Sequence, residues 1–258
     1  MKSTSLIARL VMVSICTIAS NVLAMTFYVD APYLYLGGGV VRTDWDAWEE
    51  AMIRFDGKID TIVFHDSGGG DSLAGRKIGE DIRKRKLNTV VLGRCSSACA
   101  NMFLGGVARQ YAAKQPRVHT VLGYHGSYNK KTKEVNRNKS PDYFLSMTNG
   151  KMDERFIERF IRLENKNGLL RLVHPKQLLR ASEPLAMLCN GEEERSKREE
   201  QCEKLNDVDA LAKGIVTTWD TRNVPTPPAV SREKITVKVW EAQDAKSTNY
   251  SVEAPAGG

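Results

Sequence analysis

The chain lacks the sequence signatures of several large protein classes. It has no internal repeat, and its first apolar run, from Leu10 to Ala19, is far shorter than the roughly 20 residues that a membrane span needs. No Walker motif occurs, and Gly68-Gly69-Gly70 lacks the third glycine that a dinucleotide fingerprint places at a fixed offset. The 38 basic and 31 acidic residues are interspersed, with no basic stripe of interleaved aromatic residues. We therefore expect neither a cofactor nor a nucleic-acid partner.

Residues 1–24 have the order typical of a secretory signal peptide. Lys2 and Arg9 precede a short apolar stretch, and Ala24 stands at the expected cleavage point. We expect this segment to be removed on export, which makes the mature protein periplasmic or secreted. An uncleaved anchor is the alternative.

The rest of the chain contains four cysteines, Cys95, Cys99, Cys189 and Cys202. An even number of cysteines in an exported protein favours disulfides. The last two enclose a charged run that is typical of an exposed helical insertion, so we predict a Cys189–Cys202 disulfide, and a second between Cys95 and Cys99. A zinc site is the weaker alternative because no histidine lies nearby in sequence to complete a tetrahedron.

Strand-like and helical stretches alternate through the first half of the chain. Short β-branched runs at 62–64 and 89–92 each lead into a turn of small residues and then into an apolar-periodic helix, at 72–85 and 97–104. This alternation predicts an α/β fold with parallel β-α-β units. Ligands and catalytic groups collect at the carboxyl ends of the strands in such sheets.

The two turns that follow these strands suggest a hydrolase. The glycine turn at 67–71 offers backbone N–H groups to an anion, and the second turn offers Ser97 at a helix N-terminus. His125 follows a further predicted strand at 119–124. A serine hydroxyl becomes a good nucleophile when an adjacent base takes its proton. The pattern therefore outlines a serine hydrolase.

From about 34 to 216 the chain resembles the Clp-peptidase/crotonase-like superfamily, and within it the exported bacterial Clp-peptidase-like proteins. The run 67–70 resembles the family's Ser-Pro-Gly-Gly turn, with Gly68 where proline usually stands. Ser97-Ala98 resembles the nucleophile and its successor, and Tyr124-His125 resembles the strand-end histidine.

The resemblance implies a crotonase-like domain over 25–220. The proline-rich run 225–228 and the alternating run 235–240 predict a linker, an edge strand and a disordered tail at 221–258. The run 205–215 resembles the segment that closes the family's domain, and its residue pattern predicts a short helix followed by a strand.

The resemblance also implies roles for single residues. Ser97 would be the nucleophile, His125 its general base, and Gly70 and Ala98 the donors of an oxyanion hole. The implied function is an exported, ATP-independent, peptidase-like serine hydrolase acting on a peptide or acyl substrate. No ATPase partner is expected outside the cytoplasm, and a homo-oligomer is one option because relatives form rings.

The third catalytic group is where the sequence departs from the family. Ungapped alignment backwards from Leu205 puts Cys202 where the peptidases have an aspartate. If residues 190–201 are an insertion, the position moves to near Glu183, and Asp207 and Asp209 also stay open. The chain is then a Ser-His dyad or a scaffold that has lost its chemistry.

Each candidate also has a purely structural interpretation. Ser97 could be an ordinary helix N-cap, and His125 a structural histidine. His65 competes for the role of base because it lies beside the glycine turn, and Cys95 and Cys99 flank the serine and could be nucleophiles. The alternative function is a catalytically inactive binding or assembly module in the periplasm.

Overall fold

The computed structural model describes residues 24–116, 118–129, 131–136, 140–178, 183–194, 197–227 and 239–241. The expected signal peptide lies outside these residues except for Ala24, and so does most of the predicted tail.

Strands and helices alternate through the first half of the chain. In order they are β1 (Thr26–Asp30), β2 (Tyr33–Val40), α1 (Asp44–Arg54), β3 (Thr61–Gly70), α2 (Ser72–Lys84), β4 (Asn88–Ser96) and α3 (Ala98–Leu104). The second half contains β5 (Arg109–Tyr111), β6 (Val121–Tyr124), α4 (Asp142–Met147), α5 (Glu154–Ile161), β7 (Leu169–Leu172), the 3-10 helix η1 (Pro175–Gln177), β8 (Ala186–Cys189), α6 (Arg198–Gln201), β9 (Glu203–Lys204) and β10 (Val239–Glu241).

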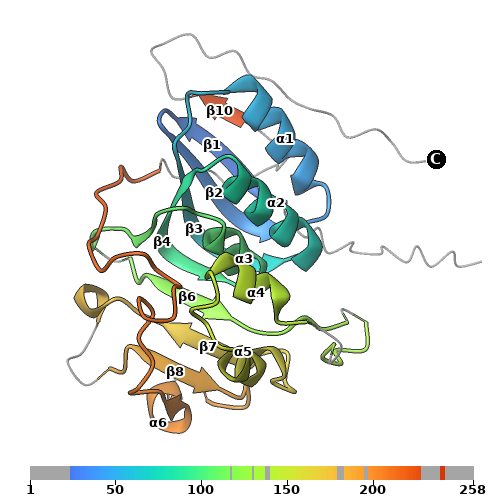
Figure 1. Cartoon of the computed structure of the whole chain (residues 1–258), viewed down its shortest axis with the longest axis vertical. Coiled ribbons are helices and arrows are strands. Elements are labelled where there is room, and N and C mark those ends of the chain that lie inside the picture. Colours follow the sequence, from blue (N-terminus) through green and yellow to red (C-terminus); the bar gives the residue numbers. More distant parts are fainter. Residues whose placement is uncertain are drawn as a thin grey trace, which may run out of the picture.

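All the strands belong to one sheet (Figure 1). Its order is β10-β1-β2-β3-β4-β6-β7-β8-β9, and β5 pairs with β4 beside this path. Strands β2, β3, β4 and β6 are parallel, whereas β7, β8 and β9 form an antiparallel extension. The links β2–α1–β3 and β3–α2–β4 confirm the predicted α/β fold with parallel β-α-β units. Strand β10 pairs in parallel with β1 at the edge of the sheet.

The helices α1, α2 and α3 lie along one face of the sheet (Figure 1). Since successive side chains of a strand point to opposite faces, Phe64 of β3 enters the core beneath the helices with Trp48 and Phe103, and Val63 joins a smaller apolar cluster around Tyr35 on the other face. Among the residues that the structure describes, none of the helices is both long and apolar enough to cross a bilayer.

Two expected helices differ from what the structure contains. The apolar residues at 156, 157, 160 and 161 predict a largely helical run over 143–163. The structure divides this run into α4 and α5, because Gly150 takes a left-handed φ of 72° and Asp153 caps a new helix through the Phe156 N–H. The run 205–213, expected to be a short helix, forms a series of turns. The buried Arg109 guanidinium binds the carbonyls of Gly214 and Ile215 and so attaches this segment to the sheet.

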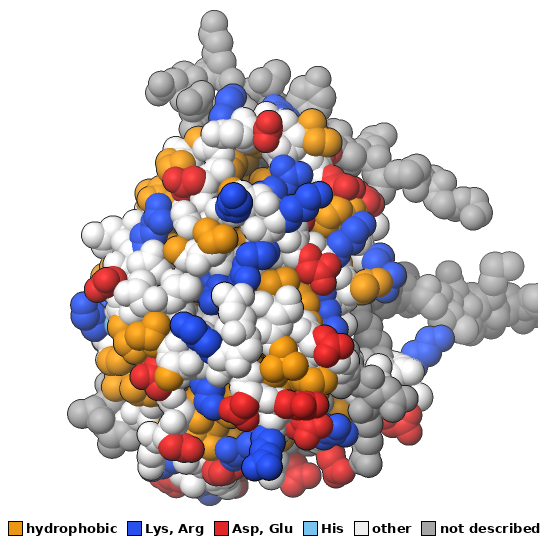
Figure 2. Space-filling model, in the orientation of Figure 1, with side chains coloured by type: hydrophobic (Ala, Val, Ile, Leu, Met, Phe, Trp, Pro, Cys, Tyr) orange, Lys and Arg blue, Asp and Glu red, His pale blue; other side chains and the backbone are white. Residues whose placement is uncertain are grey.

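Basic and acidic side chains are mixed over the face shown in Figure 2. This agrees with the interspersed charges of the sequence and is typical of a solvated surface.

Candidate functional site

Ser97 lies at the sharp junction between β4 and α3. Its backbone has φ 58° and ψ −122°, a conformation that costs a non-glycine residue about 1–3 kcal/mol. Within the described chain its side chain makes no capping hydrogen bond, in contrast to the N-cap interpretation. Ser97 is half-buried, whereas Cys95 and Ala98 close by in the chain are fully buried.

The glycine turn at the end of β3 lies against Ser97. Gly69 has φ 83°, and a Cβ there would stand 2.7 Å from Ser97 Cβ and 2.8 Å from the Ala98 nitrogen. The Ser67 hydroxyl accepts a hydrogen bond from the Gly69 N–H at 3.2 Å, which pins the turn. Gly70, by contrast, lies against β2, since its Cβ would stand 2.0 Å from the Val40 oxygen.

The sequence singled out Gly70 and Ala98 but missed Gly69, the closest of the three glycines to the serine. Nothing in a run of three glycines distinguishes the middle one. Only the structure distinguishes Gly69, because it shows that this glycine lies against the end of β4.

His125 continues directly from β6. Its half-buried ring stacks on Tyr128 with centroids 5.9 Å apart and planes 22° apart, and its Nδ1 is in hydrogen-bond contact with the Gly126 carbonyl oxygen. Gly126 is itself fixed by α5, because its N–H donates to the Phe160 carbonyl at 3.1 Å and a Cβ there would stand 2.0 Å from the Ile161 oxygen.

The backbone brings these residues to the same end of three neighbouring strands. Ser96 of β4 pairs with Gly123 of β6, and the Ser97 N–H donates to the Gly123 carbonyl at 2.8 Å. The Ser97 N–H is therefore bonded to the residue of β6 that stands two positions before His125. A direct hydrogen bond between the Ser97 hydroxyl and the imidazole stays a prediction.

Both predicted cysteine pairs lie at disulfide distance, with sulfurs 2.03 Å apart for Cys95–Cys99 and 2.00 Å apart for Cys189–Cys202. Cys95 and Cys99 flank Ser97 in the sequence and are both fully buried. Because they are bonded to each other, neither offers a free thiolate that could replace Ser97 as the nucleophile. The two pairs are compatible with an extracytoplasmic location.

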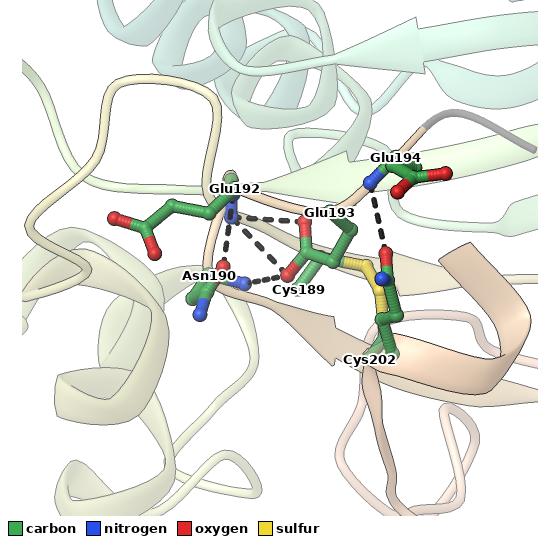
Figure 3. Close-up of a disulfide and its surroundings, with 8 residues drawn as sticks. Cys189, Asn190, Glu192, Glu193, Glu194 and Cys202 are labelled. Atoms are coloured by element: carbon green, nitrogen blue, oxygen red, sulfur yellow. Dashed lines mark hydrogen bonds between the residues drawn. A yellow bond between two sulfur atoms is a disulfide. The ribbon is translucent and has the colours of Figure 1, made fainter. Parts of the chain in front are cut away.

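Figure 3 shows the second bond with the loop that it closes. The Glu193 carboxylate accepts from the backbone N–H groups of Asn190 and Gly191, and Gln201 accepts from the Glu194 N–H at 2.8 Å. Cys189, Glu193 and Cys202 have the spacing of three metal ligands. The sulfurs of Cys189 and Cys202 are bonded to each other, whereas zinc binds free thiolates. We therefore interpret this arrangement as a disulfide that stabilises the loop.

The acids considered from the sequence lie at other places. Glu183 is buried with its carboxylate 3.8 Å from His119 Nε2, and His119 precedes β6, whereas His125 follows it. Asp209 accepts hydrogen bonds from its own turn, and Asp207 is exposed. Cys202 lies beside β9, three strands from β6 in the sheet.

Two other histidines have local partners. The His65 ring lies against Gly37, and burial lowers its pKa. Its partner on β4 is Leu92, five residues before Ser97. His174 accepts from the Lys176 N–H through Nδ1 and contacts the Trp219 carbonyl through Nε2 at 2.7 Å, which gives it a defined structural role.

A charged cleft of about 550 Å³ adjoins the helix that fixes Gly126. The exposed side of α5 and the loops after α5 and β8 line it, and its charged residues are Arg155, Glu158, Arg159, Arg162, Glu164 and Glu192. Arg162 is paired with Glu158 and Arg159 with Glu203, so the cleft holds charges of both signs.

Comparison with models of known families and with curated proteins finds no match. Among solved structures, the chain is similar to a "putative enoyl-CoA hydratase from Rhodopseudomonas palustris CGA009", with 12% identity, a TM-score of 0.30, and coverage of 39% of this chain and 48% of that one. It is also similar to a methylmalonyl CoA decarboxylase in complex with 2S-carboxypropyl CoA, with 10% identity, a TM-score of 0.38, and coverage of 55% and 61%.

The chain thus spans about half to three-fifths of the length of these two crotonase-like enzymes. The likeness concerns the arrangement of the sheet and its helices alone.

Proposed function

We propose that this chain is an exported serine hydrolase of the Clp-peptidase-like kind, with Ser97 as nucleophile and His125 as general base. The observation that carries the proposal is the backbone of Ser97. The residue is held at a positive φ, its side chain makes no capping bond within the described chain, and its N–H is bonded to the strand that ends at His125. Strained residues of this kind concentrate at active sites.

In the proposed reaction the Ser97 hydroxyl oxygen attacks an acyl carbon, and its proton passes to His125. The tetrahedral intermediate then collapses: the bond between the acyl carbon and the leaving group breaks, and the leaving group takes the proton from His125. The bond between the acyl carbon and the Ser97 oxygen is kept, which gives the acyl-enzyme. Water, deprotonated by the same imidazole, then hydrolyses the acyl-enzyme and restores the serine.

The Gly70 and Ala98 amides are the proposed donors to the oxyanion. The Asp71 N–H donates to the Val40 carbonyl at 2.8 Å, toward β2. Since successive N–H groups along a strand point to opposite sides, we infer that the Gly70 N–H points toward β4 and Ser97. Each such donor typically lowers the barrier by about 3–4 kcal/mol.

The Gly126 carbonyl is the proposed partner that orients the imidazole of His125 in place of an acid. If His125 Nδ1 carries the proton that this carbonyl accepts, Nε2 is left unprotonated as the base. In triads an aspartate holds the imidazole in this tautomer. Here the fixed backbone of Gly126 and the ring of Tyr128 would take its place, as positioning groups of a Ser-His dyad.

The proposed substrate is a peptide or acyl compound that reaches the site without an ATP-driven unfoldase. Ser97 and His125 are half-buried and not fully enclosed, which supports access by such a ligand. A homo-oligomer, a periplasmic or secreted location and signal-peptide cleavage belong to the same proposal.

Labelling with a fluorophosphonate probe tests the proposed function. We expect the wild type to be labelled at Ser97, Ser97→Ala to abolish labelling without a change in unfolding free energy, and the neighbouring Ser96→Ala to be labelled like the wild type. Labelling that survives Ser97→Ala would show that the nucleophile is another residue. A folded wild-type protein that is never labelled would favour the inactive binding module.

A further inference from the structure

Asp44, the first residue of α1, is a completely buried carboxylate. Its two oxygens accept hydrogen bonds from the Val41 N–H at 2.7 Å and the Met25 N–H at 3.3 Å. Burial raises the pKa of Asp44 to about 6, and the like charge of Asp71 adds to the rise. A buried carboxylate is costly unless it is paired with a positive charge.

The backbone nitrogen that contacts Asp44 is the one that export would set free. The expected cleavage point lies between Ala24 and Met25. The Met25 side chain is fully buried in the core, and the next residue, Thr26, pairs with Gly37 as the first residue of β1. The start of the mature chain is therefore held in place on both its side-chain and backbone sides.

We propose that cleavage after Ala24 creates an α-ammonium on Met25 that forms a buried ion pair with the Asp44 carboxylate. An endopeptidase that accepts a small residue before the cut would add water across the Ala24–Met25 bond, so that Ala24 keeps the carboxyl group and Met25 takes the amine. The neutral N–H donor at 3.3 Å then becomes a positively charged group with three donors.

The ion pair would stabilise the segment on which the glycine turn rests. Asp44 closes the turn between β2 and α1 by holding the Val41 N–H. One residue earlier, the Val40 carbonyl accepts the Asp71 N–H, and Arg42 pairs with the Asp71 carboxylate at 3.1 Å. Removal of the leader would thus change the charge balance directly behind the turn that contains Gly70.

A thermodynamic cycle tests the ion pair. It compares the protein that begins at Met25 with one that begins at Asn21, each with and without Asp44→Asn, after intact-mass measurement has verified each N-terminus. A hydrogen bond to a charged group corresponds to roughly a 10- to 100-fold change in the folding equilibrium constant. We expect that gain for the Met25 protein, its loss with Asp44→Asn, and its persistence with Asp46→Asn, an exposed acid on the same helical turn.

Equal folding constants for the two N-termini would overturn the inference, and so would a gain that survives Asp44→Asn. An exported protein that begins at a residue other than Met25 would overturn it as well. If Asp44→Asn does not fold, acetylation of the Met25 amine removes the charge without touching the carboxylate, and an unchanged folding constant would be decisive against the pair. The ion pair rests on the signal-peptide cleavage that forms part of the proposed function. None of these measurements depends on labelling of Ser97, so a failure of the ion pair and a failure of the hydrolase activity are told apart.

Discussion

Replacement of Gly69 by alanine separates the contribution of the glycine turn to the site from the ordinary cost of a left-handed residue. At φ 83° an alanine costs about 1–2 kcal/mol through its backbone alone. Its Cβ would also stand 2.5 Å from the Ser96 oxygen and 2.8 Å from the Ala98 nitrogen, and overpacking against backbone of this kind costs about 1–3 kcal/mol. We therefore expect Gly69→Ala to lower the unfolding free energy by about 2–5 kcal/mol.

Gly57→Ala is the matched control. Gly57 has φ 69°, and a Cβ there would have no atom within 4 Å, so only the backbone cost of about 1–2 kcal/mol applies. Urea denaturation followed by tryptophan fluorescence measures both changes in stability.

The same two variants differ in their expected effect on the site. The alanine at 69 has to push the turn away from Ser97 and Ala98, and loss of one oxyanion donor slows catalysis by about 10²–10³-fold. We expect fluorophosphonate labelling to be at least about tenfold slower in Gly69→Ala and unchanged in Gly57→Ala, under conditions where both are folded. Equal stability losses together with wild-type labelling in Gly69→Ala would refute the reasoning.

Three further predictions concern other parts of the chain. Nitrogen-15 NMR should find neutral His125 protonated on Nδ1 and His174 on Nε2, because their carbonyl partners lie on opposite ring nitrogens; an Nε2-protonated His125 would contradict the proposed dyad. Replacing Cys189 and Cys202 by alanine should cost about 3 kcal/mol in urea denaturation under oxidising conditions, since the bond closes a loop of about 14 residues; an unchanged midpoint would count against this. In the chain that begins at Asn21, the raised pKa of Asp44 means that the folded state binds its proton more tightly, so part of the stability should be lost as pH rises from about 4 to 6. Asp44→Asn should remove that part of the pH dependence, and identical pH profiles would argue against a shifted pKa.

The sequence was sufficient for the fold class because its buried strands are short β-branched runs bounded by small residues. The runs 62–64 and 89–92 lie in the first halves of β3 and β4. The disulfides were also predictable, because an even number of cysteines in a chain expected to be exported restricts the choices.

The errors arose where contacts distant in sequence decide local structure. The segment 205–213 has helical spacing, but the Asp209 carboxylate binds the N–H groups of Leu211 and Ala212, and Arg109 takes the carbonyls that follow. The helical spacing of a segment contains no information about a guanidinium that binds it from a strand about a hundred residues earlier.

The candidate site was predictable only as far as side chains define it. Ser97 and His125 could be proposed as site residues because their residue types and order are distinctive. The Gly126 carbonyl could not be predicted, because every residue has a carbonyl. The stacking of Tyr128 on His125 could not be predicted either, because it depends on the path of the chain after β6, where Tyr128 pairs with Val135.

The two edges of the sheet are protected in different ways against pairing with other chains. Strand β9 is two residues long, and both, Glu203 and Lys204, are exposed and charged, which discourages a further strand from pairing there. The opposite edge would be β1, a five-residue strand, and β10 covers it. Strand β10 therefore shields Phe27–Val29 of β1, and a chain that lacks β10 would expose this stretch as a template for aggregation.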